Sequence, residues 1–188
     1  MLLNVLNEYG DRSRSHGIPP EVLKAQAECL DQPIEFIESS WKDYEVNFIK
    51  KLKGLKQTYA CTHAVYGDID IESHRAWEEK VSEAAGLEPL LPIWQGDRLE
   101  LVKQMLDAGI KAMIVSCQKP LAEHLLGSVI SPDLLGVFDE LGIDACGENG
   151  EYHTLVIDGP MHQRPLQVLA GGRHDHGNYS FLELSLAK

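Results

Sequence analysis

The segment from Cys146 to Thr154 concentrates side chains that could do chemistry. It carries two carboxylates, an amide, a phenol, an imidazole and a hydroxyl: Glu148, Glu151, Asn149, Tyr152, His153 and Thr154. Gly147 and Gly150 are interleaved with them, and glycine lets a backbone approach a ligand closely or adopt positive φ. Such polar density beside a strand-like stretch is costly unless the groups are exposed or have partners. The segment therefore predicts either a ligand pocket or an exposed polar hairpin loop.

The histidines and acidic residues give no metal-binding pattern. Glu148, Glu151 and His153 are residue types that bind metals, but their spacing matches neither a helical nor a zinc-binding arrangement. The sequence therefore predicts no metal site. The glycine-flanked segment 171–177, which holds His174 and His176, is expected to be a loop joining two strands.

Two further polar segments each follow a predicted strand. The segment from Gly67 to Arg75 leads into a helix, where α/β proteins bind phosphates or Mg²⁺. Its acidic residues would equally suit the positive end of a helix dipole. The segment from Asn7 to Gly17 contains Arg14 and His16, which could bind a phosphate or a carboxylate. A flexible surface loop fits that composition equally well.

Strand-like and helix-like stretches alternate along most of the chain. Strands are expected over residues 2–6, 34–37, 60–66, 88–93, 111–116, 154–158, 166–169 and 179–186. Helices are expected over 20–30, after Ser40, and over 73–85, 97–109 and 131–141, with Ser40, Ser73, Asp97 and Ser131 as caps.

This alternation predicts an α/β fold: a Rossmann-like parallel sheet flanked by helices, with a smaller C-terminal α/β lobe. A soft boundary near 92–96 divides the chain into lobes 1–94 and 95–188. Ligands of parallel sheets bind beyond the carboxyl ends of the strands. That rule singles out three loops, at 7–19, 67–73 and 116–122.

Composition excludes several classes of function. The net charge of −12 disfavours binding to DNA. No run of about 18 or more apolar residues is present, so no membrane span is expected. The apolar N-terminus lacks the basic region and cleavage site of a signal peptide. The four cysteines are scattered without a CxxC pair, which predicts reduced thiols and a cytoplasmic protein.

Taken together and in order, these segments resemble the diphthine–ammonia ligase family of the PP-loop (N-type) ATP pyrophosphatases, whose fold is of the adenine-nucleotide α-hydrolase (HUP) type. The resemblance spans roughly residues 1–166. The matching segments are Leu6-Asn7-Glu8, Arg12–Gly17, Gly67-Asp68-Ile69, Leu91-Pro92-Ile93-Trp94, Gly147–Thr154 and Asp158-Gly159-Pro160. The segment Gly147–Thr154 is the most specific of them.

The resemblance implies an ATP-dependent ligase that adenylates a carboxylate, releases pyrophosphate and lets ammonia attack, with ATP and Mg²⁺ as cofactors. The acid would be diphthine on translation elongation factor 2 in an archaeal or eukaryotic source, or otherwise a small carboxylic acid. By motif position, the catalytic residues would be Glu148, Glu151 and His153. Substrate-binding residues would be Asn149, Gly150, Tyr152, Thr154, Arg14 and His16. Nucleotide-binding residues would be Asn7, Gly67, Asp68 and Arg75.

One family element has no counterpart in these residues. The family's Ser-Gly-Gly-Lys-Asp-Ser loop, which grips the ATP phosphates, precedes the strand with which this chain begins. The first lobe is therefore expected to be a truncated HUP-like lobe that binds ATP weakly, with impaired or incomplete ligase activity. The alternative is a non-catalytic relative that binds a nucleotide or metabolite. A strand edge left without its neighbour predicts a homo-oligomer.

Overall fold

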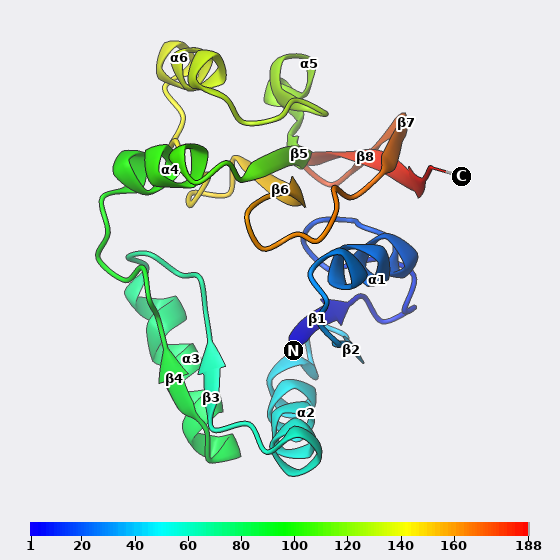
Figure 1. Ribbon diagram of the computed structural model, residues 1–188, viewed down its shortest axis with the longest axis vertical. Helices are drawn as coiled ribbons and strands as arrows, with labels where there is room; N and C mark the ends of the chain where they lie inside the picture. The colour runs from blue at the N-terminus through cyan, green and yellow to red at the C-terminus, as the bar shows by residue number, and fades with distance from the viewer. Residues whose placement is uncertain (188) are drawn as a thin grey trace. The chain divides into compact units, whose positions relative to one another are not determined.

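The computed structural model describes residues 1–187 and confirms the α/β class (Figure 1). The strands are β1 (Leu2–Leu6), β2 (Ile34–Glu38), β3 (His63–Val65), β4 (Glu88–Leu90), β5 (Lys111–Gln118), β6 (Tyr152–Asp158), β7 (Val168–His176) and β8 (Tyr179–Leu186). The helices are α1 (Pro20–Cys29), α2 (Tyr44–Tyr59), α3 (Glu72–Ala85), α4 (Arg98–Asp107), the short 3₁₀ helix η1 (Lys119–Leu121), α5 (Ala122–Leu125) and α6 (Pro132–Leu141).

Parallel pairing is found in the first half of the chain, and antiparallel pairing in the second. β1 pairs with β2 and β3 pairs with β4, both in parallel. The remaining strands form an antiparallel sheet in the order β6-β5-β8-β7. A two-residue turn at Gly177 joins β7 to β8, and such a turn permits only antiparallel pairing. The last strand predicted from the alternation, β5, therefore belongs to the antiparallel sheet.

Several predicted ends of elements are confirmed, and others are wrong. Ser40 is not the cap of its helix, because α2 begins at Tyr44 and Asp43 takes the cap position. The Ser131 hydroxyl accepts from the Leu134 N–H, and Asp97 accepts from the Glu100 N–H, as caps do. Ser73 is not a cap, because α3 already begins at Glu72 and Ile71 takes the cap position. The expected loop at 171–177 is wrong as well. Its glycine pair sits where the register between β7 and β8 shifts, as at a β-bulge, and the strand continues to His176.

The chain packs into two compact units. The larger unit combines Met1–Glu38 with the described residues from Val102 onward, and the smaller unit is Ser39–Leu101. Residues from both ends of the sequence thus share one unit. The predicted lobe boundary near residue 94 stays a prediction.

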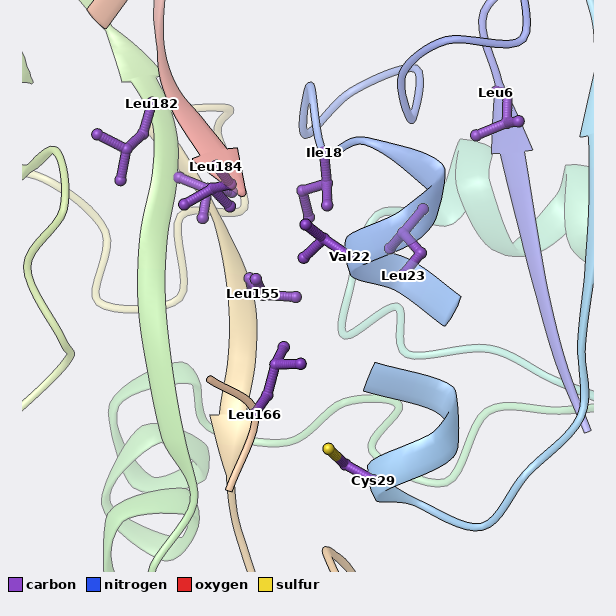
Figure 2. Packing of buried hydrophobic residues seen from close by; sticks show 10 residues of the cluster. Leu6, Ile18, Val22, Leu23, Cys29, Leu155, Leu166, Leu182 and Leu184 are labelled. Carbon is purple, nitrogen blue, oxygen red and sulfur yellow. The ribbon is translucent and has the colours of Figure 1, made fainter. Parts of the chain in front are cut away.

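Helix α1 is held to the antiparallel sheet by one of the two apolar clusters of the larger unit. Ile18, Val22 and Leu23 approach the sheet from the helix side (Figure 2). From the sheet side come Val115, Leu155, Leu166, Leu182 and Leu184. A second cluster contains Ile114, Cys117 and Tyr152 together with Leu125 and Phe138. Because Ile114 and Val115 are neighbours on β5 and point to opposite faces, the sheet is covered on both sides.

The smaller unit is built on the β3–β4 pair and helices α2 and α3. Tyr44, Phe48 and Trp77 form an aromatic cluster between the two helices, with ring centroids 5.1–6.0 Å apart. Across residues 1–187, no helix is both long enough and apolar enough to cross a membrane.

The Leu155→Ala substitution tests how far the larger unit depends on its apolar interior. Leu155 is 1% exposed, so its truncation should lower the free energy of unfolding by about 2–5 kcal/mol. Leu169 lies on β7 of the same sheet and is 55% exposed, so Leu169→Ala should have little effect. Urea denaturation of both variants provides the measurement. Equal losses in the two would contradict the packing described.

Candidate functional site

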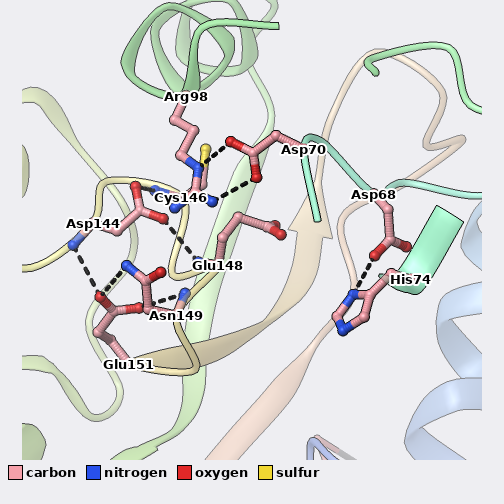
Figure 3. Close-up of polar contacts among 9 residues, drawn as sticks. All are labelled: Asp68, Asp70, His74, Arg98, Asp144, Cys146, Glu148, Asn149 and Glu151. Carbon is pink, nitrogen blue, oxygen red and sulfur yellow. Dashed lines mark hydrogen bonds and ion pairs between the residues drawn. The ribbon is translucent and has the colours of Figure 1, made fainter. Parts of the chain in front are cut away.

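The polar loop between α6 and β6 folds around a carboxylate of its own. Glu151 is 8% exposed, and its Oε1 accepts from the Asp144 N–H at 3.2 Å. Its Oε2 accepts from the Asn149 N–H at 3.1 Å, and the Asn149 amide donates to Oε1 at 3.2 Å (Figure 3). A buried carboxylate with three donors has its desolvation cost largely offset. Glu151 therefore fixes the shape of the loop.

A second carboxylate and a glycine complete this turn. Asp144 accepts from the backbone N–H groups of Cys146 at 3.2 Å and Glu148 at 2.9 Å. Gly147 has a φ of +71°, and an added Cβ would lie 3.0 Å from the Tyr152 carbonyl oxygen. A side chain at position 147 would thus suffer both an unfavourable φ and a close contact. The sequence signal of interleaved glycines correctly located a tightly turned segment.

The remaining predicted residues of this loop lie in different surroundings. Tyr152 points into the second apolar cluster, where its hydroxyl donates to the Ala145 carbonyl at 2.5 Å and burial raises its pKa. The Gly150 carbonyl accepts from the Tyr179 hydroxyl at 2.8 Å, which ties the loop to β8. Glu148 is half-buried, and Thr154 lies on β6 opposite Ile114.

Two histidines from distant parts of the sequence meet beside this loop. The ring centroids of His16 and His153 lie 4.9 Å apart, with the rings tilted by 52°. Burial, reinforced by the neighbouring His153, lowers the pKa of His16 to about 4. Burial also lowers the pKa of His153. Both imidazoles are therefore uncharged at neutral pH.

The segment around His16 is fixed against the sheet by specific contacts. Gly17 has a φ of +70°, and a Cβ there would lie 2.6 Å from the Phe181 ring. The Ser116 hydroxyl donates to the Ser15 carbonyl at 3.4 Å. Arg14, whose side chain is 8% exposed, pairs with Glu8 at 3.0 Å. The predicted segments around His16 and Gly147–Thr154 are therefore neighbours in the larger unit.

Asn7 belongs to the same N-terminal loop, where its side chain stabilises a turn. Its amide donates to Asp11 Oδ1 at 2.6 Å, and its own oxygen accepts from the Asp11 N–H at 3.2 Å. Its predicted contact with a nucleotide stays a prediction.

The other predicted nucleotide-binding residues lie in the smaller unit, after β3. Asp68 lies 2.7 Å from the ring nitrogen Nδ1 of His74. Arg75 donates to Glu79 at 2.8 Å and covers the Trp94 ring at 5.2 Å. Arg98 donates two hydrogen bonds to the Asp70 carboxylate, at 2.6 and 2.8 Å (Figure 3). Gly67 begins the loop and has open space around it.

Glu78 is a carboxyl group that no sequence pattern distinguishes. It is 4% exposed on the inward face of α3, and its Oε2 has no hydrogen-bond partner within residues 1–187. Burial and a hydrogen bond with Asp68 raise its pKa above the usual range. The Glu78 carboxyl group therefore holds a proton at neutral pH. Only its position on the helix, revealed by packing, distinguishes it from its acidic neighbours.

Within residues 1–187, no group of three His, Cys, Asp or Glu side chains is placed so that it could hold a metal ion. In the larger unit, the structure brings together the loop held by Glu151, the imidazoles of His16 and His153, and the N-terminal loop. In the smaller unit, it brings Asp68 together with Glu78 and His74.

The fold and these loops define an α/β protein whose antiparallel C-terminal sheet carries a polar loop beside a histidine pair. A family model for the diphthamide synthase N-terminal domain matches residues 1–89, and one for the diphthamide synthase C-terminal domain matches residues 97–188. The two models match nearly the whole chain in the expected order. The chain belongs to the diphthamide synthase family.

Individual relatives support the same assignment. Over 124 residues the chain is 29% identical to the diphthine–ammonia ligase of Mus musculus and 28% identical to that of Homo sapiens, covering 62% of this chain and 46% of each relative. The Schizosaccharomyces pombe enzyme of the same name is 26% identical over 167 residues, which are 77% of this chain and 27% of that protein. The matches span less than half the length of these three relatives.

The Glu151→Gln substitution tests whether this carboxylate holds the loop together. Glutamine has an NH₂ donor where the carboxylate has its second acceptor oxygen. At least one N–H group of the loop therefore loses its acceptor. We expect the free energy of unfolding to fall by about 1–3 kcal/mol, measured by urea denaturation. Glu140→Gln, at an exposed position of α6, is the matched control and should be neutral. A neutral Glu151→Gln would show that the loop does not need the carboxylate.

The lowered pKa of His16 predicts an acid-sensitive fold. Above about pH 6.5 the imidazole is neutral in both the folded and the unfolded chain. As the pH falls toward 4, the unfolded chain binds a proton that the folded protein does not, and stability is lost by up to about 3 kcal/mol.

His16→Phe should remove this part of the pH dependence, whereas His176→Phe, at an exposed position on β7, should keep it. Free energies of unfolding measured from about pH 7 to about pH 4 provide the comparison. Identical pH profiles for wild type and His16→Phe would rule out the effect.

Proposed function

We propose that this chain takes part in an ATP-dependent, amide-forming ligation of the diphthine–ammonia ligase type. A substrate carboxylate oxygen would attack the α-phosphorus of ATP and release pyrophosphate. Ammonia would then attack the acyl carbon, AMP would leave, and the new nitrogen would lose one proton. The observation that carries the proposal is the match of both diphthamide synthase domains, in order, to residues 1–89 and 97–188. The relatives named above carry this activity in their names.

The larger unit would provide the acyl-acceptor side of the reaction. Glu148 and His153 are proposed as catalytic residues, and Glu151 as the residue that positions their loop, since its carboxylate is occupied by Asp144 and Asn149. The proposed substrate-binding residues are Arg14, His16, Asn149, Gly150, Tyr152 and Thr154. A rigid loop suits this task, because catalysis of ligation depends mainly on placing the reactants.

The smaller unit would contribute to the nucleotide side. Gly67 and Asp68 follow a strand that pairs in parallel, and Arg75 lies on the helix that comes next. Loops in that position commonly contact phosphates. No set of three metal-ligating side chains occurs within residues 1–187, so Mg²⁺ would be carried chiefly by the phosphates of ATP, with Asp68 as its protein contact.

The acid is proposed to be diphthine on translation elongation factor 2, which places the reaction in the cytoplasm. The protein is further proposed to act as a homo-oligomer. The antiparallel sheet supports this, because its edge strand β7 is exposed along most of its length. Exposed strand edges favour pairing between chains.

Exchange of labelled pyrophosphate into ATP tests the first half of the reaction. The protein is used as its cell produces it, including any residues beyond this chain. Exchange should require the acid and not ammonia, whereas AMP and amide should appear in equal amounts only when ammonia is added. One arm contains elongation factor 2 bearing diphthine, and a second contains a panel of small carboxylic acids. Absence of acid-dependent exchange in both arms would refute the proposal.

The Glu148→Gln substitution adds a test of the site. Loss of a catalytic carboxylate should lower the ligation rate by about 10²-fold or more, with little change in stability. Glu140→Gln should leave the rate unchanged, since that side chain is exposed on α6. If both variants ligate at the wild-type rate, Glu148 has no catalytic role.

A further inference from the structure

Glu78 occupies a position of helix α3 where an apolar side chain would be expected. The inward face of α3 is formed by its buried residues, Glu78, Val81, Ser82 and Ala85, which follow the spacing of one helix face. The Ser82 hydroxyl has a partner on this face, the Tyr66 hydroxyl at 2.8 Å. Within residues 1–187, the Glu78 atom Oε2 is withdrawn from solvent and has no hydrogen-bond partner. Burial of Glu78 is therefore less favourable than burial of an apolar residue at this position.

The carboxyl group of Glu78 meets Asp68, which lies in the loop after β3. The two carboxyl groups are in hydrogen-bond contact, and such a contact requires that one of them keeps its proton. Burial and this contact raise the pKa of Glu78, so Glu78 is the donor and Asp68 is the acceptor. The Asp68 side chain is 25% exposed. The acceptor therefore reaches solvent, whereas the donor lies behind it in the interior of the smaller unit.

A second side chain of α3 also contacts Asp68. His74 lies four residues before Glu78, on the same side of the helix. Its ring nitrogen Nδ1 lies 2.7 Å from Asp68 Oδ1 (Figure 3). A carboxylate has about four acceptor positions, so these two contacts leave positions on Asp68 for a ligand. The His74 side chain is itself 55% exposed, which makes Glu78 the more firmly fixed of the two contacts.

We propose that Glu78 is a positioning residue for the nucleotide side of the reaction: its hydrogen bond holds Asp68 in the orientation that contacts MgATP. This inference rests on the proposed function, which places Asp68 against the nucleotide. Glu78 does not touch the nucleotide, and no bond forms or breaks at its carboxyl group. A buried polar residue that lowers stability is expected where function requires it.

The substitutions Glu78→Met and Glu78→Gln distinguish this role from a structural one. Methionine has a similar length but donates no hydrogen bond, so the Kd for MgATP should rise about tenfold. The melting temperature should stay the same or rise by about 2–4 °C, because a buried polar group is removed and water can reach Asp68. Glutamine keeps a donor in its NH₂ group, so Glu78→Gln should hold the Kd within about twofold of the wild-type value.

The measurements are calorimetric titration with MgATP and thermal unfolding, on the protein as its cell produces it. The matched control is Glu83→Met, at an exposed position of the same helix, which should change neither quantity. A double-mutant cycle tests whether Glu78 acts through Asp68. Asp68→Asn should weaken MgATP binding, and the addition of Glu78→Met should cause no further loss. A further loss equal to that in the wild-type background would overturn the inference.

A lower melting temperature with an unchanged Kd in Glu78→Met would show a structural residue and overturn the inference, as would failure of this variant to fold. Loss of MgATP binding in Glu78→Gln would also overturn it, because the charge and not the donor would then be needed. Pyrophosphate exchange separates these outcomes from the proposed function. Exchange in the wild type with an unchanged Kd in Glu78→Met refutes the inference alone. MgATP binding without acid-dependent exchange refutes the proposed function, and the Kd values of the variants still decide the inference. A wild-type protein that does not bind MgATP overturns both.

Discussion

Val22 has no exposed surface, and it is buried where helix α1 meets the antiparallel sheet. This apolar contact joins the first 38 residues of the chain to strands that begin after residue 110. The loop immediately before α1 carries His16, so the position of that histidine follows from the position of the helix. In the folded protein His16 thereby lies beside His153, although the two are far apart in the sequence.

The larger unit handles buried polar groups in two different ways. The Glu151 carboxylate is compensated by three N–H donors from its own loop. The imidazoles of His16 and His153 lack such donors and instead remain uncharged. Both arrangements avoid a buried, unpaired charge, but they differ in the hydrogen-bonding positions that remain free. The carboxylate is saturated and serves as structure, whereas the imidazoles keep free hydrogen-bonding positions.

The smaller unit adds a third arrangement, in which the pKa of the buried Glu78 is raised beside Asp68, and Asp68 in turn contacts His74. The matched N-terminal domain includes the Asp68 loop, and the matched C-terminal domain includes the Glu151 loop. Both loops therefore lie in regions that match this family. The matched region covers 46% of the length of the mouse and human relatives.

The sequence by itself determined the α/β class, most element positions and the tightly turned loop at Gly147–Gly150. These are set by local factors: apolar periodicity, capping side chains such as Ser131, and glycines at turns. Local patterns also misled, since the glycines at 171 and 172 mark a bulge within β7 rather than a loop. Only the tertiary structure decided that β5 pairs antiparallel, that Glu151 points into its own loop, that Glu78 is buried and that His16 meets His153. Apart from the orientation of Glu151, which depends on contacts within its own loop, each of these depends on which distant apolar surfaces pack together, and no local pattern in one sequence encodes that choice.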